Sequence, residues 1–133
     1  MRVNVFELAY RYVYPSVRRR LVQILYLDFG LKQMEISRLL GLTQSAVSRY
    51  ITSSRGVFVD ISRFGDIDQA IKKLAAEIVN NGLDKYTVQY ELARITLKAL
   101  GQGYLCGFHR KLEEDVDLRK CRTCLNLFRT FIY

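Results

Sequence analysis

The stretch 33–51, QMEISRLLGLTQSAVSRYI, constrains the fold of this chain more than any other. Ile36 and Leu40 lie four residues apart, which places both on one face of a helix. Gly41 follows directly, and glycine readily adopts the positive φ angle that a tight turn after a helix requires. The pattern therefore predicts a short helix over 32–40 that ends in a sharp turn.

A second helical pattern begins just after this turn. Thr43 can cap a helix over 44–51 through its hydroxyl group, and Val47 and Tyr50 lie on one face of that helix. Leu42 is expected to fill the space beneath the turn. The two patterns together predict a helix–turn–helix.

The outward positions of the second helix carry side chains that suit contacts with DNA bases. Glutamine can pair with adenine through two hydrogen bonds, arginine can pair with guanine in the same way, and serine can bond to either. No acidic residue, which would repel phosphate, occurs between Glu35 and Asp60. The outward residues are Gln44, Ser45, Ser48 and Arg49.

The segments before the hairpin also read as helices. A first helix is expected over 3–13, and Pro15 suits the first turn of the next helix, where its missing N–H costs no hydrogen bond. Gly30 is expected to end that second helix.

The segments after the hairpin complete a mostly α fold. The alternating apolar residues of 57–61 predict a short strand or an extended loop. Asp66 is expected to cap an amphipathic helix over 67–79, and a similar pattern predicts a helix over 86–100. A last apolar piece covers 125–132.

Basic residues concentrate in the first part of the chain. Residues 1–55 contain nine Lys and Arg against three Asp and Glu, a net charge of +6. Residues 56–133 contain twelve against ten, a net charge of +2. This asymmetry favours a polyanionic partner for the N-terminal part.

The hairpin resembles the helix–turn–helix of the Xre/λ-repressor-like transcriptional regulators. The longer run VYPSVRRRLVQILYLDFGLKQMEISRLLGLTQSAVSRYITSSRG is similar to a group of predicted archaeal regulators with this domain, which tend to carry a C-terminal Cys-rich element. The resemblance covers residues 10–56, and the tail matches more loosely. It implies sequence-specific binding to double-stranded DNA, usually by a homodimer on a pseudo-palindromic site. Lys32 stands where such helices often begin with a capping Ser or Thr.

The resemblance also implies roles for individual residues. The outward residues of the second helix would face bases, and Gln33 would meet a phosphate. Arg55 follows the second helix directly, where contacts to the DNA backbone are common. The predicted DNA-binding residues are Gln33, Thr43, Gln44, Ser45, Ser48, Arg49 and Arg55.

All three cysteines and the one histidine fall within residues 106–124, CGFHRKLEEDVDLRKCRTC. Cys106 and His109 form a C-x-x-H pair, Cys121 and Cys124 form a C-x-x-C pair, and eleven residues separate the pairs. Thiolate and imidazole are ligands that zinc favours, and four of them close a tetrahedral site. The spacing predicts a Cys3His metal-binding knuckle with a structural zinc ion.

Two other interpretations of this segment remain open. An iron–sulfur cluster held by the three cysteines, with His109 as fourth ligand or bystander, would make the protein a redox or iron sensor. Alternatively, the cysteines are buried and inert and the histidine is unrelated to them. In the metal-binding cases, nearby basic residues are expected to offset the thiolate charge and to lower the thiol pKa values. These are Arg110, Lys111, Arg119, Lys120 and Arg122.

The sequence thus predicts a transcriptional regulator and not an enzyme. Residues 1–56 are expected to form the DNA-binding domain, and residues 57–133 a helical dimerisation and metal-binding region. The helix over 67–79 or the helix over 86–100 is expected to supply the homodimer interface. No apolar run is long enough to cross a bilayer and the N-terminus does not resemble a signal peptide, so we expect a cytoplasmic protein without a membrane partner.

Two other function classes also fit the sequence. A protein-interaction or assembly module would use the hairpin without DNA. A sequence-independent nucleic-acid-binding protein, including one that binds RNA, would show a steep salt dependence and little discrimination between sequences.

Overall fold

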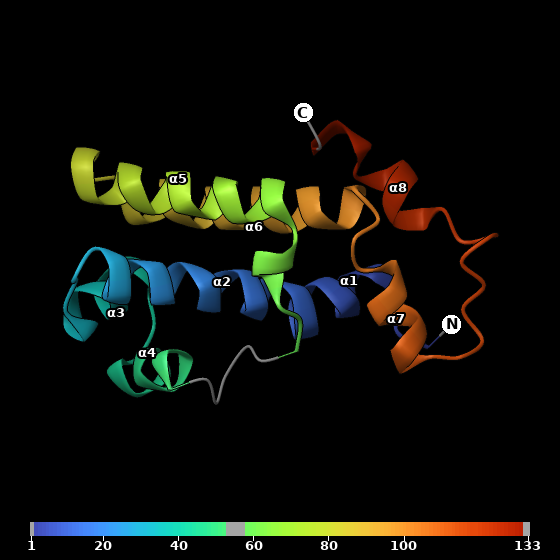
Figure 1. Ribbon diagram of the computed structural model, residues 1–133, viewed down its shortest axis with the longest axis horizontal. Coiled ribbons are helices and arrows are strands. Elements are labelled where there is room, and N and C mark those ends of the chain that lie inside the picture. Colours follow the sequence, from blue (N-terminus) through green and yellow to red (C-terminus); the bar gives the residue numbers. More distant parts are fainter. Residues whose placement is uncertain (1, 53–57, 132–133) are drawn as a thin grey trace.

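The computed structural model describes residues 2–52 and 58–131, and within these ranges it contains helices and turns but no strand. The fold is mostly α, as predicted. The helices lie in two layers (Figure 1). None of the described helices is both long and apolar enough to span a bilayer.

The first layer is a helical rod built from four segments that follow one another without a break (Figure 1). Pro15 lies in the first turn of the third segment, as predicted. The turn before it is π-helical, with the Tyr14 N–H bonded to the Ala9 carbonyl. A π turn widens the helix where the proline ring would crowd the preceding residues, so the rod continues past Pro15. The segments are α1 (Val5–Leu8), η1 (Ala9–Val13), α2 (Tyr14–Gln23) and η2 (Ile24–Asp28).

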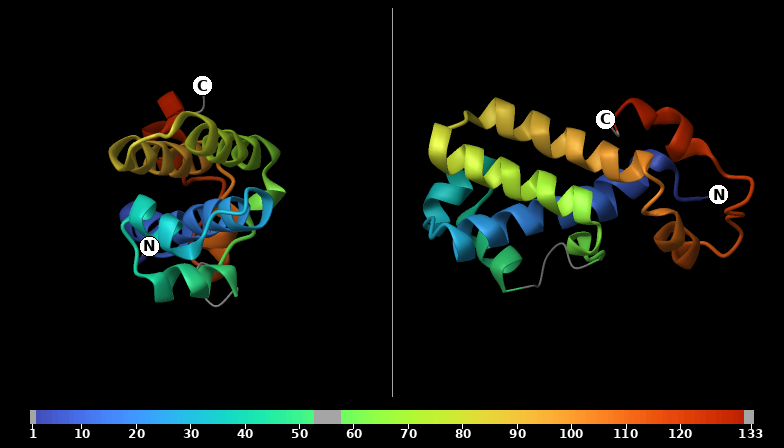
Figure 2. Two further views of the ribbon diagram at one scale, coloured as in Figure 1. Left: turned by 90° about the vertical axis from the view of Figure 1, so that its left-hand side faces the viewer. Right: turned by 45° about the horizontal axis from the view of Figure 1, so that its top comes forward.

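The second layer consists of α5 (Gly65–Asn81) and α6 (Lys85–Gly101), which run antiparallel side by side (Figures 1 and 2). The prediction that Asp66 caps α5 is wrong, because α5 begins at Gly65, two residues before the predicted start, and Phe64 holds the cap position. The carboxylate of Asp66 instead accepts a hydrogen bond from Gln102 Nε2 at 3.0 Å.

In the described part of the region between the hairpin and α5, residues 58–64, the chain does not form the strand considered from the sequence. Within the described part of this region, Ile61–Arg63 forms a short 3₁₀ helix, η3. Ile61 is buried and Val59 is half-buried. Val57 and the predicted domain boundary at residue 56 lie outside the described residues.

Two small groups of helices lie at opposite ends of the molecule (Figure 1). One end holds α3 (Gln33–Leu40) and α4 (Gln44–Ile51). The other end holds α7 (Cys106–Leu112), α8 (Thr123–Leu127) and the 3₁₀ turn η4 (Arg129–Phe131). No residue of α8 or η4 is buried.

The apolar faces of α5 and α6 pack against the rod within one chain. Both helices contribute buried side chains to a single hydrophobic cluster that also includes residues of α2, α3 and α4. The faces that we expected to be left over for a homodimer are therefore covered inside the chain. The buried apolar side chains of the two helices are Ile67, Ile71, Leu74, Ala75, Ile78, Val88, Leu92, Ile95, Ala99 and Leu100.

A partly buried ion pair joins the two layers. Arg20 Nε donates to Asp68 Oδ1 at 2.7 Å, and Lys72 Nζ lies 3.2 Å from Asp68 Oδ2. Burial opposes ionisation of Asp68, but hydrogen bonds from Arg20 and Lys72 outweigh this effect and hold the pKa of its carboxyl below the ordinary value. Asp68 is therefore charged at neutral pH and links α2 to α5.

Candidate nucleic-acid interface and cysteine cluster

The turn between α3 and α4 has the geometry that the sequence predicted. Gly41 has a φ of 65°, and the Leu42 N–H bonds to the Ser37 carbonyl at 3.0 Å. Thr43 Oγ1 accepts a hydrogen bond from the Ala46 N–H at 3.1 Å and so caps α4. The positive φ at Gly41 turns the chain sharply and fixes where α4 begins.

The inner positions of this hairpin are buried as predicted. Ile36 and Val47 are 0% exposed, Leu40 is 2% exposed and Tyr50 is 1% exposed. Val47, Tyr50 and the buried Ala46 form the inner face of α4, so the exposed Gln44, Ser45 and Arg49 lie on its outer side.

α3 begins without a capping Ser or Thr, and a hydrogen bond to a glutamate side chain closes its first turn instead. Lys32 occupies the cap position, and its backbone N–H donates to Glu35 Oε1 at 3.2 Å. This is the acidic half of a capping box. Glu35, the only acidic side chain of the hairpin, is therefore bonded to the backbone at the start of its own helix.

The predicted DNA-facing residues lie together on one side of the hairpin. Gln44, Ser45 and Arg49 are exposed, while Gln33 and Ser48 are half-buried. These five residues line a single shallow depression in the surface, to which no acidic residue of the described part of the chain contributes. Thr43 is exposed but its hydroxyl serves as the helix cap, and Arg55 lies outside the described residues.

Two residues outside the hairpin contact it through polar groups that the sequence did not reveal. Arg18 Nε of α2 donates to the Tyr50 hydroxyl at 2.9 Å. Gln89 Nε2 of α6 donates to the Leu40 carbonyl at 3.1 Å. Gln89 is 49 residues from its partner, so no local pattern could have marked it.

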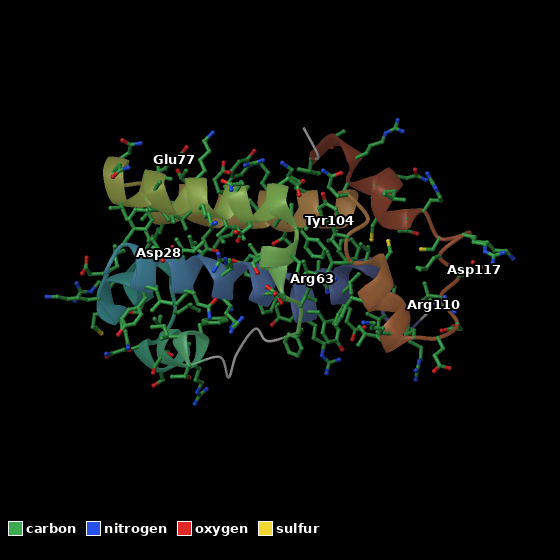
Figure 3. The ribbon with its side chains drawn as sticks, in the orientation of Figure 1. Asp28, Arg63, Glu77, Tyr104, Arg110 and Asp117 are labelled. Atoms are coloured by element: carbon green, nitrogen blue, oxygen red, sulfur yellow. The ribbon has the colours of Figure 1, made fainter. Side chains whose placement is uncertain are left out.

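At the opposite end, the structure brings the predicted metal ligands around one small pocket. Cys106, His109, Cys121 and Cys124 line it together with apolar side chains such as Leu8 of the rod. Sulfur atoms gather between α7 and α8 (Figure 3). All three cysteines are free thiols and half-buried. Among the described residues, however, no three His, Cys, Asp or Glu side chains converge closely enough to hold a metal ion.

His109 is held by a neighbouring carboxylate. Its Nε2 atom lies 3.2 Å from Glu113 Oε2, and both side chains are almost fully buried. Glu113 Oε1 also accepts hydrogen bonds from the Arg2 N–H and, at 2.9 Å, from the Val3 N–H. Glu113 therefore ties the N-terminus of the rod to α7.

The environment of the thiols differs from the one that we predicted. Burial, with smaller contributions from the nearby Cys106 and Cys121, raises the pKa of Cys124 to about 11. Burial likewise raises the pKa of Cys106, with a smaller contribution from Cys121. The prediction that basic neighbours lower these pKa values is wrong for both thiols in their metal-free form, because burial in an apolar pocket and the neighbouring cysteines disfavour the thiolate.

The chain matches no protein-family model, no curated protein and no solved structure in comparisons with known proteins. The part of the chain that the structure describes is a small all-helical domain. The case for a function depends on the side chains of the hairpin and of the cysteine cluster alone.

Proposed function

We propose that this protein is a sequence-specific DNA-binding transcriptional regulator of the Xre/λ-repressor-like kind, with α4 as the helix that enters the major groove. The observation that carries the proposal is the depression lined by Gln33, Gln44, Ser45, Ser48 and Arg49. It lies on a hairpin whose Gly41 turn and buried inner face leave these side chains pointing outward.

The chemistry of this depression suits base edges better than a metal or a small apolar ligand. The Gln44 amide offers a donor and an acceptor, which together match adenine. The Arg49 guanidinium offers parallel donors that match guanine, and the serine hydroxyls can bond to either base. The net charge of +6 over residues 1–55 attracts the phosphate backbone.

Binding as a homodimer is part of the same proposal, since two half-sites one helical turn apart would suit two copies of α4. The buried faces of α5 and α6 cannot form the interface, but α6 also has an outer face. Tyr86 and Tyr90 lie four residues apart on it and are 75% and 65% exposed. Such a regulator acts in the cytoplasm, on chromosomal DNA.

The cysteine cluster forms the second part of the proposal, as a Cys3His site for structural zinc. The support is that the four side chains line one pocket and that Glu113 holds one ring nitrogen of His109. A carboxylate on one nitrogen is the arrangement that orients metal-binding histidines. Zinc would supply four bonds that draw the thiols together. An iron–sulfur cluster is the alternative, and metal content and visible absorbance of protein purified without oxygen separate the two.

Selection from a pool of random DNA duplexes tests the DNA-binding proposal. The unmodified protein should enrich one motif, and the double variant Gln44→Ala, Arg49→Ala should lose that enrichment. The matched control is Gln69→Ala, Lys73→Ala, which removes one amide and one positive charge from exposed positions of α5 and should enrich the same motif.

Two other outcomes would each favour a different function class. Binding to all duplexes without enrichment would indicate sequence-independent nucleic-acid binding. No binding to any duplex at low salt would favour the protein-interaction module instead.

A further inference from the structure

Gln89 of α6 makes two hydrogen bonds that join three helices. Its Nε2 atom donates to the Leu40 carbonyl at 3.1 Å, and its Oε1 atom accepts from the Tyr14 hydroxyl at 2.8 Å. Tyr14 belongs to α2, and Leu40 is the last residue of α3. Both polar atoms of the glutamine amide are therefore used inside the chain.

The Leu40 carbonyl lies where α3 ends and the turn to α4 begins. The last carbonyls of a helix have no partner within that helix. Leu40 directly precedes Gly41, whose positive φ sets the direction in which α4 leaves the turn. A donor on this carbonyl holds the end of α3, and through Gly41 it holds the start of α4.

A second set of contacts holds the other end of α4. The Arg18 guanidinium carbon lies 5.1 Å from the centre of the Tyr14 ring and 5.4 Å from that of Tyr50. Arg18 Nε also donates to the Tyr50 hydroxyl at 2.9 Å. Tyr14, Arg18 and Gln89, which we call the hairpin clamp, thus connect the Leu40 carbonyl to Tyr50 of α4.

We infer that the hairpin clamp sets the angle of α4 and that Gln89 is a positioning residue for DNA reading, although it does not touch DNA. This inference rests on the proposed function. Base contacts through paired hydrogen bonds require their side chains to be held to within about 0.5 Å, which needs rigid support behind the helix. In this protein part of that support comes from α6, far along the chain from the hairpin. The C-terminal half would then contribute to sequence preference.

The substitution Gln89→Glu tests the clamp with little change in shape. A glutamate can still accept from the Tyr14 hydroxyl but cannot donate to the Leu40 carbonyl. The matched control is Gln69→Glu, the same change at an exposed position of α5, which adds the same negative charge. Binding to the selected duplex should weaken about tenfold relative to this control, the size of one lost hydrogen bond, while binding to random duplexes should match it.

Hydrogen exchange supplies a second readout that needs no DNA. Amide exchange over 41–52 should be faster in Gln89→Glu than in Gln69→Glu, by more than the difference in global stability between the two variants accounts for. If Gln89→Glu does not fold, the variant Tyr14→Phe replaces it in the same two measurements. This substitution removes only the hydroxyl that bonds to Gln89.

The failure of this inference and the failure of the proposed function give different results. Equal selected-site affinity and equal hairpin exchange in the glutamate variant and its control would overturn the role of Gln89. Faster hairpin exchange, with no sequence preference in the unmodified protein, would overturn the DNA-reading function and this role of Gln89 with it.

Discussion

The two ends of this molecule are organised in different ways. At one end, α3 and α4 come from one continuous stretch of chain, and their inner side chains are buried in the common core. At the other end, the pocket of the cysteine cluster combines residues of α7, α8, the segment between them and the rod. No side chain of α8 is buried.

The difference shows what each end depends on. The hairpin is determined by local spacing, one glycine and one cap, and its apolar positions supply the stabilising burial. The cysteine end has no buried side chain in α8, and its contacts with the rod include the hydrogen bonds of Glu113 and the ring contact between Phe108 and Tyr12. A bound metal would supply the constraint that its small core does not.

The largest expected effect on stability is the difference between two Leu→Ala substitutions, one at each end of the molecule. Leu40→Ala should lower the free energy of unfolding by about 2–5 kcal/mol, because Leu40 is 2% exposed and leaves a cavity. Leu127→Ala should change it by less than about 0.5 kcal/mol, because Leu127 is 56% exposed. Urea denaturation of both variants measures the contrast. Equal losses would mean that the cysteine end is as tightly packed as the hairpin.

Zinc should reduce the difference in stability between the two ends, because it should stabilise the cysteine end. At a concentration 100 times its dissociation constant, zinc should raise the free energy of unfolding by about 2.7 kcal/mol. Calcium, which prefers oxygen ligands, is the control ion and should have no effect. The double variant Cys121→Ser, Cys124→Ser should lose the zinc effect, as followed by thermal denaturation under reducing conditions. An unchanged zinc effect in that variant would remove the metal site from this end.

The hairpin end should be distinguished by DNA binding and not by stability. Gln44→Ala should weaken binding to the selected duplex by about 1–3 kcal/mol, the cost of one paired base contact, with little change in thermal stability. Gln69→Ala, the same change on α5, should bind as the unmodified protein does. Fluorescence anisotropy at one fixed salt concentration measures both affinities. A loss of equal size in the two variants would contradict base reading by Gln44.

The smallest effect concerns the ion pair between the layers, midway between the two ends. Asp68→Asn should cost about 1 kcal/mol of stability near neutral pH, because Arg20 and Lys72 lose a charged partner. The pKa of Asp68 is lowered in the folded protein, so the contribution is fully present above the ordinary pKa of about 3.9. It is lost as the pH falls through the lowered pKa of the folded state.

Unfolding curves from neutral pH to about pH 2 should therefore converge for Asp68→Asn and the unmodified protein at the acid end. Glu114→Gln, a change at an exposed carboxylate of the loop after α7, is the control and should leave the profile unchanged. A difference that stays constant across this pH range would assign the loss to packing and not to charge.

The same contrast explains how far the sequence predicted the structure. The hairpin helices, the Gly41 turn and the Thr43 cap were predicted because each depends on residues only a few positions apart. The prediction of an Asp66 cap was wrong because tertiary contacts act on Asp66 itself and on the nearby Phe64. Phe64, at the observed cap position, stacks on Tyr104 with ring centres 4.6 Å apart, and Gln102 bonds to the Asp66 carboxylate.

The candidate sites show the same limit. Spacing and the resemblance together identified the residues that line the surface depression, and spacing identified the cysteine and histidine side chains of the cysteine pocket, but neither identified the residues that support them. Gln89 and Glu113 act on partners 49 and 110 residues away, respectively. The raised thiol pKa values depend on burial by residues of the rod and of α6, which no spacing of cysteines and basic residues encodes.

The most direct test compares both ends in one measurement, an NMR titration of the labelled protein with the selected duplex. The amide signals of 43–50, at the start and along the length of α4, should shift most, and those of α7 and α8 should shift least. A duplex of scrambled sequence should produce smaller shifts at α4 under the same conditions. Largest shifts at α7 and α8, or identical shifts with both duplexes, would contradict the claim that α4 reads DNA sequence.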